Sequence, residues 1–314
     1  MVQPFVSVVI PCYNGAAYVR AAVVSAVQQT YSRLEVIVVD DGSTDDTPRT
    51  LEQLREHGVL LLKQANGGVA SARNAGIAAA SGDLIALLDQ DDEWYPHKIS
   101  QQVPLLSSDV AAVGSLMHYV GSTGKVIGVS GELADHRRQD IIAGHFMPFA
   151  PSSVLFRRAD IVALGGFNEQ LARWAPVDDA DAISRLATLG NVVTVMEPLG
   201  RYRLHAEAGS AKQFFTIQKG AAYLTAARAN PNLTIADFER SYAVGRGERV
   251  RQLGRYLYRD AGVRLASGMY VSGVLRLIVS IVLGPRYALG RLARQRGGTL
   301  RTIAARRSLK QRDT

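Results

Sequence analysis

The 314-residue sequence predicts an α/β protein with a mostly parallel central sheet flanked by helices, followed by an α-helical C-terminal extension. Short apolar runs alternate with helix-like segments, and the runs are apolar on both faces, as strands covered by helices on each side must be. The charged residues are also distributed unevenly between the two parts of the chain. Residues 1–210 carry 16 Lys and Arg against 23 Asp and Glu, whereas residues 211–314 carry 20 against 5. We therefore expect a catalytic domain over 1–210 and a basic helical region over 211–314.

The predicted elements follow one another in a regular order. The expected strands are 6–11, 34–41, 59–63 and 83–89, and the expected helices are 16–29, 48–56 and 69–80. The strand segments are rich in Val, Ile and Leu, the first and third helical segments are rich in Ala, and Pro48 suits the first turn of its helix. Strands joined by helical crossovers predict a parallel sheet.

The N-terminus and the cysteine content indicate a reducing compartment. Cys12 is the single cysteine, so no disulfide can form within the chain. No basic stretch precedes the first apolar run, and Pro4 and Pro11 interrupt it, so this run is expected to be a strand and not a signal peptide. We expect a cytoplasmic protein.

Acidic residues cluster where two of the expected strands end. Asp40 and Asp41 end the second strand, and Asp89, Asp91 and Asp92 end the fourth. Ligands of parallel sheets bind beyond the carboxyl ends of the strands, so we expect these carboxylates to line one crevice. Their repulsion requires a cation or a proton, and alternating carboxylates suit Mg²⁺ or Mn²⁺ with positions left for phosphate oxygens. A helix cap is the alternative for any single Asp.

Three familiar kinds of site are excluded because the sequence lacks the motifs that they require. A calcium-binding EF-hand loop requires glycine at its sixth position, where the loops beginning at Asp41 and Asp89 have Asp46 and Trp94. The dinucleotide fingerprint G-x-G-x-x-G is absent after the first strand, and so is the phosphate loop G-x-x-x-x-G-K-[ST].

Five stretches, taken in order, resemble the family 2 glycosyltransferases of the GT-A fold. They lie within about residues 5–205 and read VSVVIPCYNG, SAVQQTYSRLEVIVVDDGSTDDT, NGGVASARNAGIAAASGDLIALLDQDD, DDADAISRLATLG and RYRLH. Within the third stretch, DQD at 89–91 looks like the DxD signature that carries the metal and the sugar nucleotide in this fold. The resemblance implies a nucleotide-sugar-dependent, inverting transferase.

The resemblance implies nucleotide contacts for Pro11, Tyr13, Asn14, Asp41, Arg73 and Asp89. The Tyr13 ring would lie against the base, and Asp41 would accept the imide hydrogen of uracil, which favours a UDP- or dTDP-sugar. Arg73 would contact the nucleotide and phosphate, with Asn74 helping to orient it, and Asp89 the ribose or a metal-bound water. Alternatives remain: Tyr13 could pack on the first helix, and Arg73 could be a solvated helix charge.

The same resemblance assigns the diphosphate end of the site. Asp91 would bind Mg²⁺ or Mn²⁺ bridging the donor phosphates, and His205 resembles a residue that approaches the metal or the diphosphate. Asp92 would support the loop, and Arg203 could hold phosphate as a fixed cation. A structural histidine is the alternative for His205.

The catalytic base is expected at Asp179. The family pattern is Glu-Asp followed by a helix and an Arg; here Asp178 replaces the Glu, and Asp179 falls on the base position. The alternative is that Asp178, Asp179 and Asp181 form an acidic helix N-terminus favoured by the helix dipole. Asp181 and Arg185, four residues apart, are expected to form an ion pair. Acceptor choice is expected in the region of roughly 115–175.

The C-terminal region predicts an amphipathic helix. Polar or small residues recur every four positions, at Arg264, Gly268, Ser272, Arg276 and Ser280, while valines, leucines and isoleucines fill the remainder. The uninterrupted stretch 269–283 would be about 22 Å long, short of the ~30 Å hydrocarbon core, so we expect it to lie on a membrane. Further arginines would meet anionic headgroups: Arg286, Arg291, Arg294, Arg296, Arg301, Arg306 and Arg307. The alternatives are a helix docked on its own body or on a homodimer partner; no nucleic-acid-binding fold is recognisable.

The favoured function is a metal-dependent inverting glycosyltransferase in cell-surface glycan synthesis, peripheral at the inner face of the cell membrane. Its acceptor would be a saccharide or a lipid-linked saccharide. The alternatives are a sugar-nucleotide pyrophosphorylase, for which PCYNGAAY is a poor phosphate loop, and a non-catalytic sugar-nucleotide-binding protein. A processive polymer synthase is disfavoured, because the Q-x-x-R-W element is missing.

Overall fold

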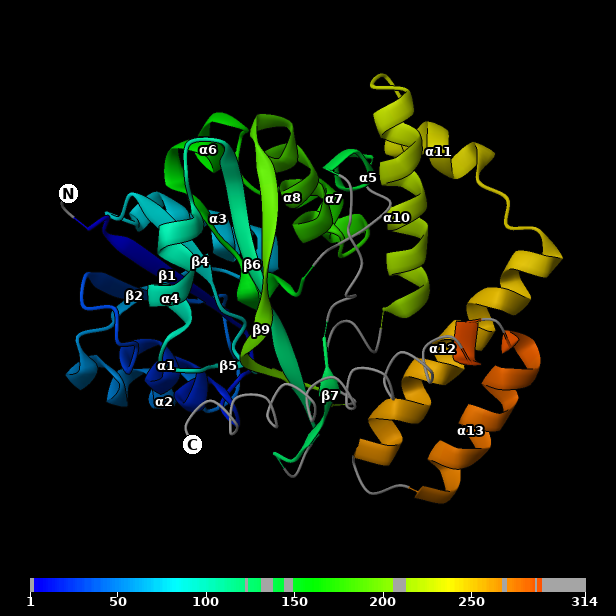
Figure 1. Cartoon of the computed structure of the whole chain (residues 1–314), viewed down its shortest axis with the longest axis horizontal. Coiled ribbons are helices and arrows are strands. Elements are labelled where there is room, and N and C mark those ends of the chain that lie inside the picture. The colour runs from blue at the N-terminus through cyan, green and yellow to red at the C-terminus, as the bar shows by residue number, and fades with distance from the viewer. Residues whose placement is uncertain are drawn as a thin grey trace, which may run out of the picture. The chain divides into compact units, whose positions relative to one another are not determined.

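A computed structural model describes residues 3–121, 124–130, 138–143, 149–205, 213–266, 270–285 and 287–289. Its first half alternates strands and helices as expected (Figure 1). The elements are β1 (Val6–Cys12), α1 (Val19–Val27), β2 (Leu34–Asp40), α2 (Thr47–Gln53), β3 (Leu60–Lys63), α3 (Val69–Ala79) and β4 (Leu84–Leu87). All seven predicted elements are present, with ends that differ by up to three residues.

The four N-terminal strands form a parallel sheet in the order β3-β2-β1-β4. Val6 of β1 pairs with Leu34 of β2 on one side and with Leu84 of β4 on the other. Their carboxyl ends therefore lie along one edge of the sheet, and the loops that follow β1, β2 and β4 begin there.

The second half of the domain extends this sheet with antiparallel strands. β8 (Leu155–Arg157) pairs antiparallel with β4, and the order continues through β6 (Val110–Val120), β9 (Asn191–Arg203) and β5 (Glu93–Trp94), while β7 (Val126–Val129) pairs with β6. The remaining helices here are α4 (Lys98–Gln102), α5 (Arg138–Ile142), α6 (Arg158–Ala163), α7 (Glu169–Trp174) and α8 (Asp178–Leu189). The predicted α/β class with a mostly parallel central sheet is confirmed.

Two apolar layers cover the sheet, one on each face. Val9 of β1 and Ile37 of β2 belong to a cluster with α3, α6 and α8, whereas Val8 and Ile10 of β1 belong to a cluster with α1. Successive strand residues point to opposite faces, so a strand covered on both sides must be apolar at every position. This explains the continuous apolar runs from which the strands were predicted.

The chain divides into two compact units. The first comprises 1–118, 130–203 and 216–239, and the second comprises 119–129, 204–215 and 240–314. The C-terminal elements are α10 (Phe214–Ala229), α11 (Ile235–Ser241), α12 (Arg246–Ala266) and α13 (Tyr270–Leu283), so the predicted helical extension is confirmed. The predicted domain limit at residue 210 lies outside the described residues. No helix in the described part of the chain is long and apolar enough to cross a membrane.

Candidate active site

The loop after β1 is held by side chains of the loop after β2. Asn14 has a positive φ of 48°, and its side-chain oxygen accepts a hydrogen bond from the Thr44 backbone N–H at 2.8 Å. The backbone N–H groups of residues 14, 15 and 16 donate to the side chains of Ser43, Thr47 and Asp45. These N–H groups are therefore occupied within the chain, unlike the free N–H groups of a phosphate loop.

Tyr13 follows β1 at the same edge of the sheet, and Gln90, the middle residue of the DQD sequence, holds its backbone. The Gln90 side-chain oxygen accepts from the Tyr13 backbone N–H at 2.9 Å, and the Gln90 amide donates to the Tyr13 backbone oxygen at 3.1 Å. The Tyr13 side chain is 45% exposed, as a ring that receives a ligand must be. Pro11 is buried within β1, and its contact with the nucleotide stays a prediction.

Asp41 organises the glycine turn that precedes α3. One of its carboxylate oxygens accepts hydrogen bonds from the Gln64 amide and the Gly67 N–H, and the other accepts from the Gly68 N–H, each at 2.8 Å. Gly68 has a φ of +87°, a conformation that favours glycine. Each carboxylate oxygen can accept two hydrogen bonds, so the oxygen that binds Gly68 retains capacity for one more. The predicted contact of Asp41 with uracil stays a prediction.

Arg73 joins the DQD loop to the first turn of α8. Its side chain is only 5% exposed, so the alternative of a solvated helix charge is wrong. The Arg73 Nη2 donates to Asp89 Oδ1 at 2.9 Å, and Nη1 donates to Asp178 Oδ2 at 3.0 Å. Burial acts to lower the pKa of Arg73, but the charges of Asp89, Asp178 and Asp179 outweigh it and raise this pKa above its usual value. Arg73 is thus a fixed cation between two acidic segments.

The loop 165–169 supports Arg73 from one side. The Arg73 guanidinium carbon lies 5.4 Å from the centre of the Phe167 ring. The neighbouring Asn74 fixes the Phe167 backbone, because its amide donates to the Phe167 oxygen at 2.9 Å and its oxygen accepts from the Phe167 N–H at 2.8 Å. Asn74 was expected to orient Arg73; it contacts the loop that carries the ring instead.

The first turn of α8 presents two adjacent carboxylates in different environments. Asp178 is buried and bound to Arg73. Asp179 is partly buried, and its Oδ1 accepts a hydrogen bond from the Ala180 N–H at 2.7 Å. Burial, followed by the charge of Asp178, raises the pKa of Asp179 to about 7, although Arg73 opposes this. A carboxylate with a pKa near neutrality is matched to proton transfer at neutral pH.

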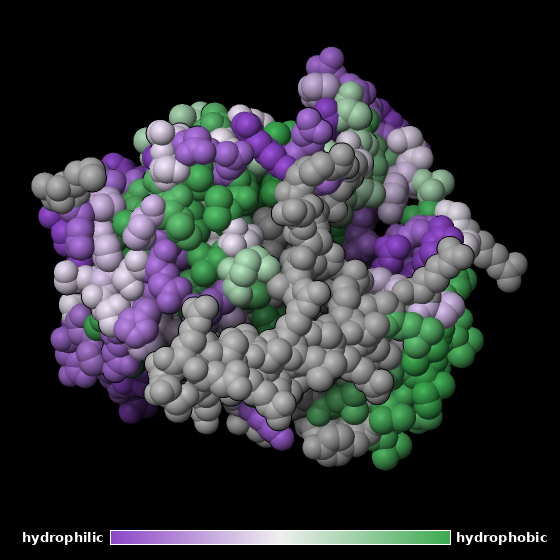
Figure 2. Space-filling model, in the orientation of Figure 1, coloured by the Kyte–Doolittle hydropathy of each residue, from purple (hydrophilic) through white to green (hydrophobic). Residues whose placement is uncertain are grey.

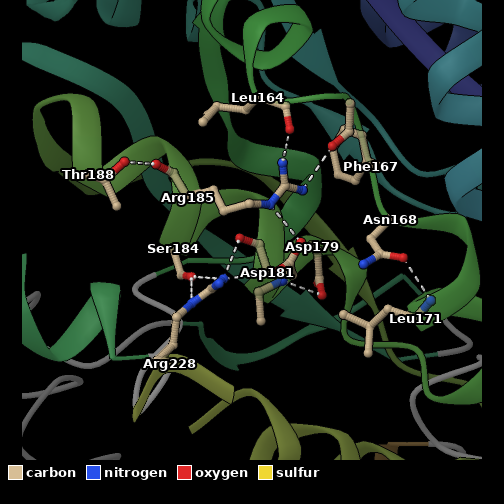
Figure 3. A network of polar contacts seen from close by, with 12 residues as sticks. Leu164, Phe167, Asn168, Leu171, Asp179, Asp181, Ser184, Arg185, Thr188 and Arg228 are labelled. Atoms are coloured by element: carbon tan, nitrogen blue, oxygen red, sulfur yellow. Dashed lines mark hydrogen bonds and ion pairs between the residues drawn. The ribbon is translucent and has the colours of Figure 1, made fainter. Parts of the chain in front are cut away.

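The remaining acid of α8 has a structural role (Figure 3). Asp181 Oδ2 accepts from Arg185 Nε at 2.7 Å, so the predicted ion pair is confirmed, and Oδ1 accepts from Arg228 Nη2 at 2.7 Å. Arg185 also donates to the backbone oxygens of Leu164 and Gly166. A cavity of about 640 Å³ lies beside this network, and its described lining includes none of the predicted site residues.

The acidic loop is anchored by Arg203 at the end of β9. The Arg203 backbone N–H donates to Asp92 Oδ1 at 2.9 Å, its Nε donates to the Asp91 backbone oxygen at 3.1 Å, and its Nη2 donates to Glu93 at 2.6 Å. Burial, then the charges of Asp91 and Asp89, raise the pKa of Asp92 well above its usual value. Asp92 and Arg203 are therefore bound to each other and to the same loop, and the roles expected for them at the diphosphate stay predictions.

The donor set at this edge suits a hard divalent cation. Burial raises the pKa of the Cys12 thiol to about 12, and the charges of Asp40, Asp45 and Asp91 add to the rise, so several carboxylates act on the end of β1. Among the described residues, no three His, Cys, Asp or Glu side chains are grouped to hold a metal by themselves. Mg²⁺ is commonly held by one or two carboxylates and completed by substrate phosphates, and Asp91 with Asp89 fits that arrangement.

The predicted residues divide into those that the structure joins and those that it does not. Arg73, Asp89 and Asp178 are in direct contact, and Asp179 adjoins them. His205 belongs to the second unit, so its approach to the metal stays a prediction. Two contributors were missed: Gln90, and Ser152, whose hydroxyl accepts from the Asp89 N–H at 3.0 Å. The middle position of DQD was a signal for Gln90, whereas nothing in the sequence marked Ser152.

Known proteins resemble this chain over parts of its length. The family described as glycosyl transferase family 2 matches residues 7–164. An uncharacterised glycosyltransferase of Nostoc sp. is 32% identical over 263 residues, which is 81% of each chain. The UDP-Glc:alpha-D-GlcNAc-diphosphoundecaprenol beta-1,3-glucosyltransferase of Escherichia coli is 34% identical over 125 residues, 40% of this chain and 50% of that enzyme. The chain spans about a third of the length of some further curated relatives.

Solved structures share the fold. A mannosyltransferase from Pyrobaculum calidifontis in complex with GDP-Man and Mn²⁺ superposes with a TM-score of 0.57 at 20% identity, covering 96% of this chain and 81% of that one. At this identity the similarity shows a common architecture and does not transfer the ligands.

Proposed function

The chain belongs to glycosyltransferase family 2, and on that premise we propose that it is an inverting enzyme that uses Mg²⁺ or Mn²⁺ and transfers a sugar from a UDP- or dTDP-sugar. The acceptor is a saccharide or a lipid-linked saccharide in cell-surface glycan synthesis. One observation carries this proposal: the Arg73 guanidinium holds Asp89 of the DQD loop and Asp178 of α8 at 2.9 and 3.0 Å. This contact joins the two segments that resemble the donor and base motifs, which supports the proposal that they form one site.

The donor end of the proposed site lies at the β1 and β4 loops. The exposed Tyr13 ring stacks against the base, an interaction that contributes about 1–3 kcal/mol where bases stack on aromatic rings in other proteins. Asn14 shapes the loop that carries Tyr13, and Asp41 accepts the uracil imide hydrogen through its less occupied oxygen. Asp89 would contact the ribose or the hydrated metal, Asp91 would hold the metal, and His205 is the further predicted ligand. A bound Mg²⁺ or Mn²⁺ supplies Lewis-acid stabilisation of the leaving diphosphate.

The transfer itself requires one proton acceptor. The acceptor hydroxyl attacks the sugar C1 opposite the diphosphate, Asp179 takes the hydroxyl proton, and the C1–O bond to the nucleoside diphosphate breaks with its electron pair on that oxygen. One displacement of this kind inverts the anomeric centre. The pKa of about 7 for Asp179 supports this role, and the ion pair that occupies Asp178 supports Asp179 over its neighbour.

The place of action follows from the acceptor. One relative is named for a diphosphoundecaprenol-linked acceptor, which supports a lipid-linked acceptor for this chain. We therefore propose a cytoplasmic enzyme that is peripheral at the inner face of the cell membrane, where such an acceptor is found.

Calorimetry with a panel of nucleotide sugars tests the donor proposal. UDP- or dTDP-sugars are expected to bind, and to bind more tightly with Mn²⁺, because Asp91 would hold the ion and the ion would offset the negative charge of the diphosphate. The same panel incubated with acceptor saccharides should yield free nucleoside diphosphate. A strong preference for GDP-sugars would remove the assignment of Asp41, and donor binding without transfer to any acceptor would indicate a non-catalytic binding protein.

A further inference from the structure

The helical hairpin α12–α13 of the second unit turns its apolar residues outward. On α13, Val271, Leu275 and Val282 are 79%, 59% and 74% exposed, while Ser280 is fully buried. The exposed set continues along the same helix, and its members are Val271, Val274, Leu275, Ile278, Val279 and Val282. Figure 2 shows this hydrophobic surface where Figure 1 places α13.

The polar stripe was predicted to lie on one helix from Arg264 onward, and this is wrong: α12 ends at Ala266 and α13 begins at Tyr270, so Arg264 lies on α12, whereas Arg276 of α13 faces α12. Arg276 Nε lies 2.8 Å from Asp260 Oδ2, and Arg264 Nε donates to the same oxygen at 2.9 Å. A Cβ at Gly273 would lie 2.7 Å from the Leu265 side chain, so a glycine is needed where the two helices approach. A helix lying alone on a membrane would turn such a stripe to water or to headgroups. Here Asp260 pairs with Arg276 inside the hairpin, and this ion pair fixes which side of α13 faces out.

An exposed apolar face of this extent marks an interaction surface. The helix has 14 residues and is about 21 Å long, so it is too short to cross the ~30 Å hydrocarbon core. An amphipathic helix of this kind can lie in the plane of the interface with its apolar face among the acyl chains.

The charge of the adjoining sequence favours an anionic membrane as the partner of this apolar face. Residues 285–314 contain nine Lys and Arg and one acidic residue, Asp313. Basic residues beside an apolar face are attracted to anionic lipid headgroups. In a dimer formed through α13, by contrast, the apolar face would be buried between two copies of the chain, so the oligomeric state distinguishes the two occupants.

We infer that the outer face of α13 is the surface by which the protein binds an anionic lipid bilayer, with the helix lying in the interface. This inference deepens the proposed function, since it names the partner and the contact surface of the peripheral enzyme. The arginines at 286–307 that were expected at the headgroups lie outside the described residues.

The test is flotation of the full chain with vesicles of phosphatidylcholine mixed with phosphatidylglycerol, compared with vesicles of phosphatidylcholine alone. The wild-type protein is expected to float with the anionic vesicles and much less with the neutral ones. The double variant Leu275→Glu/Ile278→Glu should lose at least about tenfold in vesicle affinity, because two charges enter the apolar face. The matched control Val162→Glu/Leu189→Glu, which changes exposed apolar residues of the first unit, should float like the wild type.

Two further measurements keep the result interpretable. Donor binding by calorimetry should be the same in wild type and double variant, so loss of flotation with normal donor binding separates this inference from the proposed function. If the double variant unfolds, Val271→Ser/Val282→Ser replaces it. Undiminished flotation of a folded variant overturns the inference. So does a wild-type dimer, measured by sedimentation, that the α13 variants convert to a monomer without vesicles.

Discussion

Replacing Asp179 with asparagine is expected to leave donor affinity unchanged and to lower kcat by roughly 10²- to 10⁴-fold, the usual contribution of a positioned general base. The amide keeps the shape of the side chain and cannot take the acceptor proton. Donor affinity is measured by calorimetry and turnover by release of nucleoside diphosphate. The control is Asp46→Asn, an exposed acid whose side chain caps no helix, which should leave both quantities unchanged.

The pH dependence of activity and of stability provides a second test of the role of Asp179. Only the ionised carboxylate accepts a proton, so wild-type kcat/KM should rise with pH with a midpoint of about 7. Stability should move the opposite way. The folded state holds this proton more tightly than the unfolded chain, so Asp179 loses its stabilising effect as pH rises from 3.8 to about 7. The asparagine variant should therefore gain stability relative to the wild type over that window. An unchanged acidic limb in the variant would remove Asp179 from the mechanism.

Replacing Arg73 with lysine is expected to reduce kcat/KM by about 100-fold or more, because one ammonium group cannot hold Asp89 and Asp178 on two separate nitrogens. Small displacements of reacting groups have effects of that size. The variant should also be less stable, since a buried carboxylate would lose its partner. Both effects are measured, turnover by steady-state kinetics and stability by urea unfolding.

A second arginine gives the matched control for this variant. Arg157 also holds an aspartate, Asp160, and donates to the Val110 backbone oxygen, but it pairs with Leu84 at the start of β4, on the opposite edge of the sheet. Arg157→Lys should lose stability without a comparable loss of turnover. If Arg73→Lys lost no more activity than Arg157→Lys, Arg73 would be a structural residue only.

The strand pattern could be predicted because it has a local cause. Val8, Val9 and Ile10 must all be apolar, since successive residues of a strand covered on both faces enter opposite layers. The antiparallel partners of β4 were not predicted, because β8 is three residues long and its pairing depends on contacts distant in sequence.

The carboxylates of the candidate site could be predicted from the sequence, whereas the ion pairs that join them could not. Asp89 and Asp179 stand in recognisable motifs, but the Arg73 bridge between Asp89 and Asp178 joins residues 16 and 105 positions apart. The outward apolar face of α13 likewise depends on Asp260 of α12, which accepts both Arg264 and Arg276. The sequence period marked the polar side of α13 but placed Arg264 on the same helix, whereas Arg264 belongs to α12, and which side of α13 faces out depends on that partner helix.

The central claim is that the DQD loop and the first turn of α8 form one site. The direct measurement is a crystal structure of the wild-type protein with UDP and Mn²⁺, in which anomalous scattering locates the manganese. The account predicts an Asp91 oxygen about 2.1 Å from the ion, with the Asp179 carboxylate facing the same hollow within about one sugar width of the β-phosphate. A manganese ion bound away from Asp91, or an Asp179 carboxylate separated from the diphosphate by the body of α8, would contradict it.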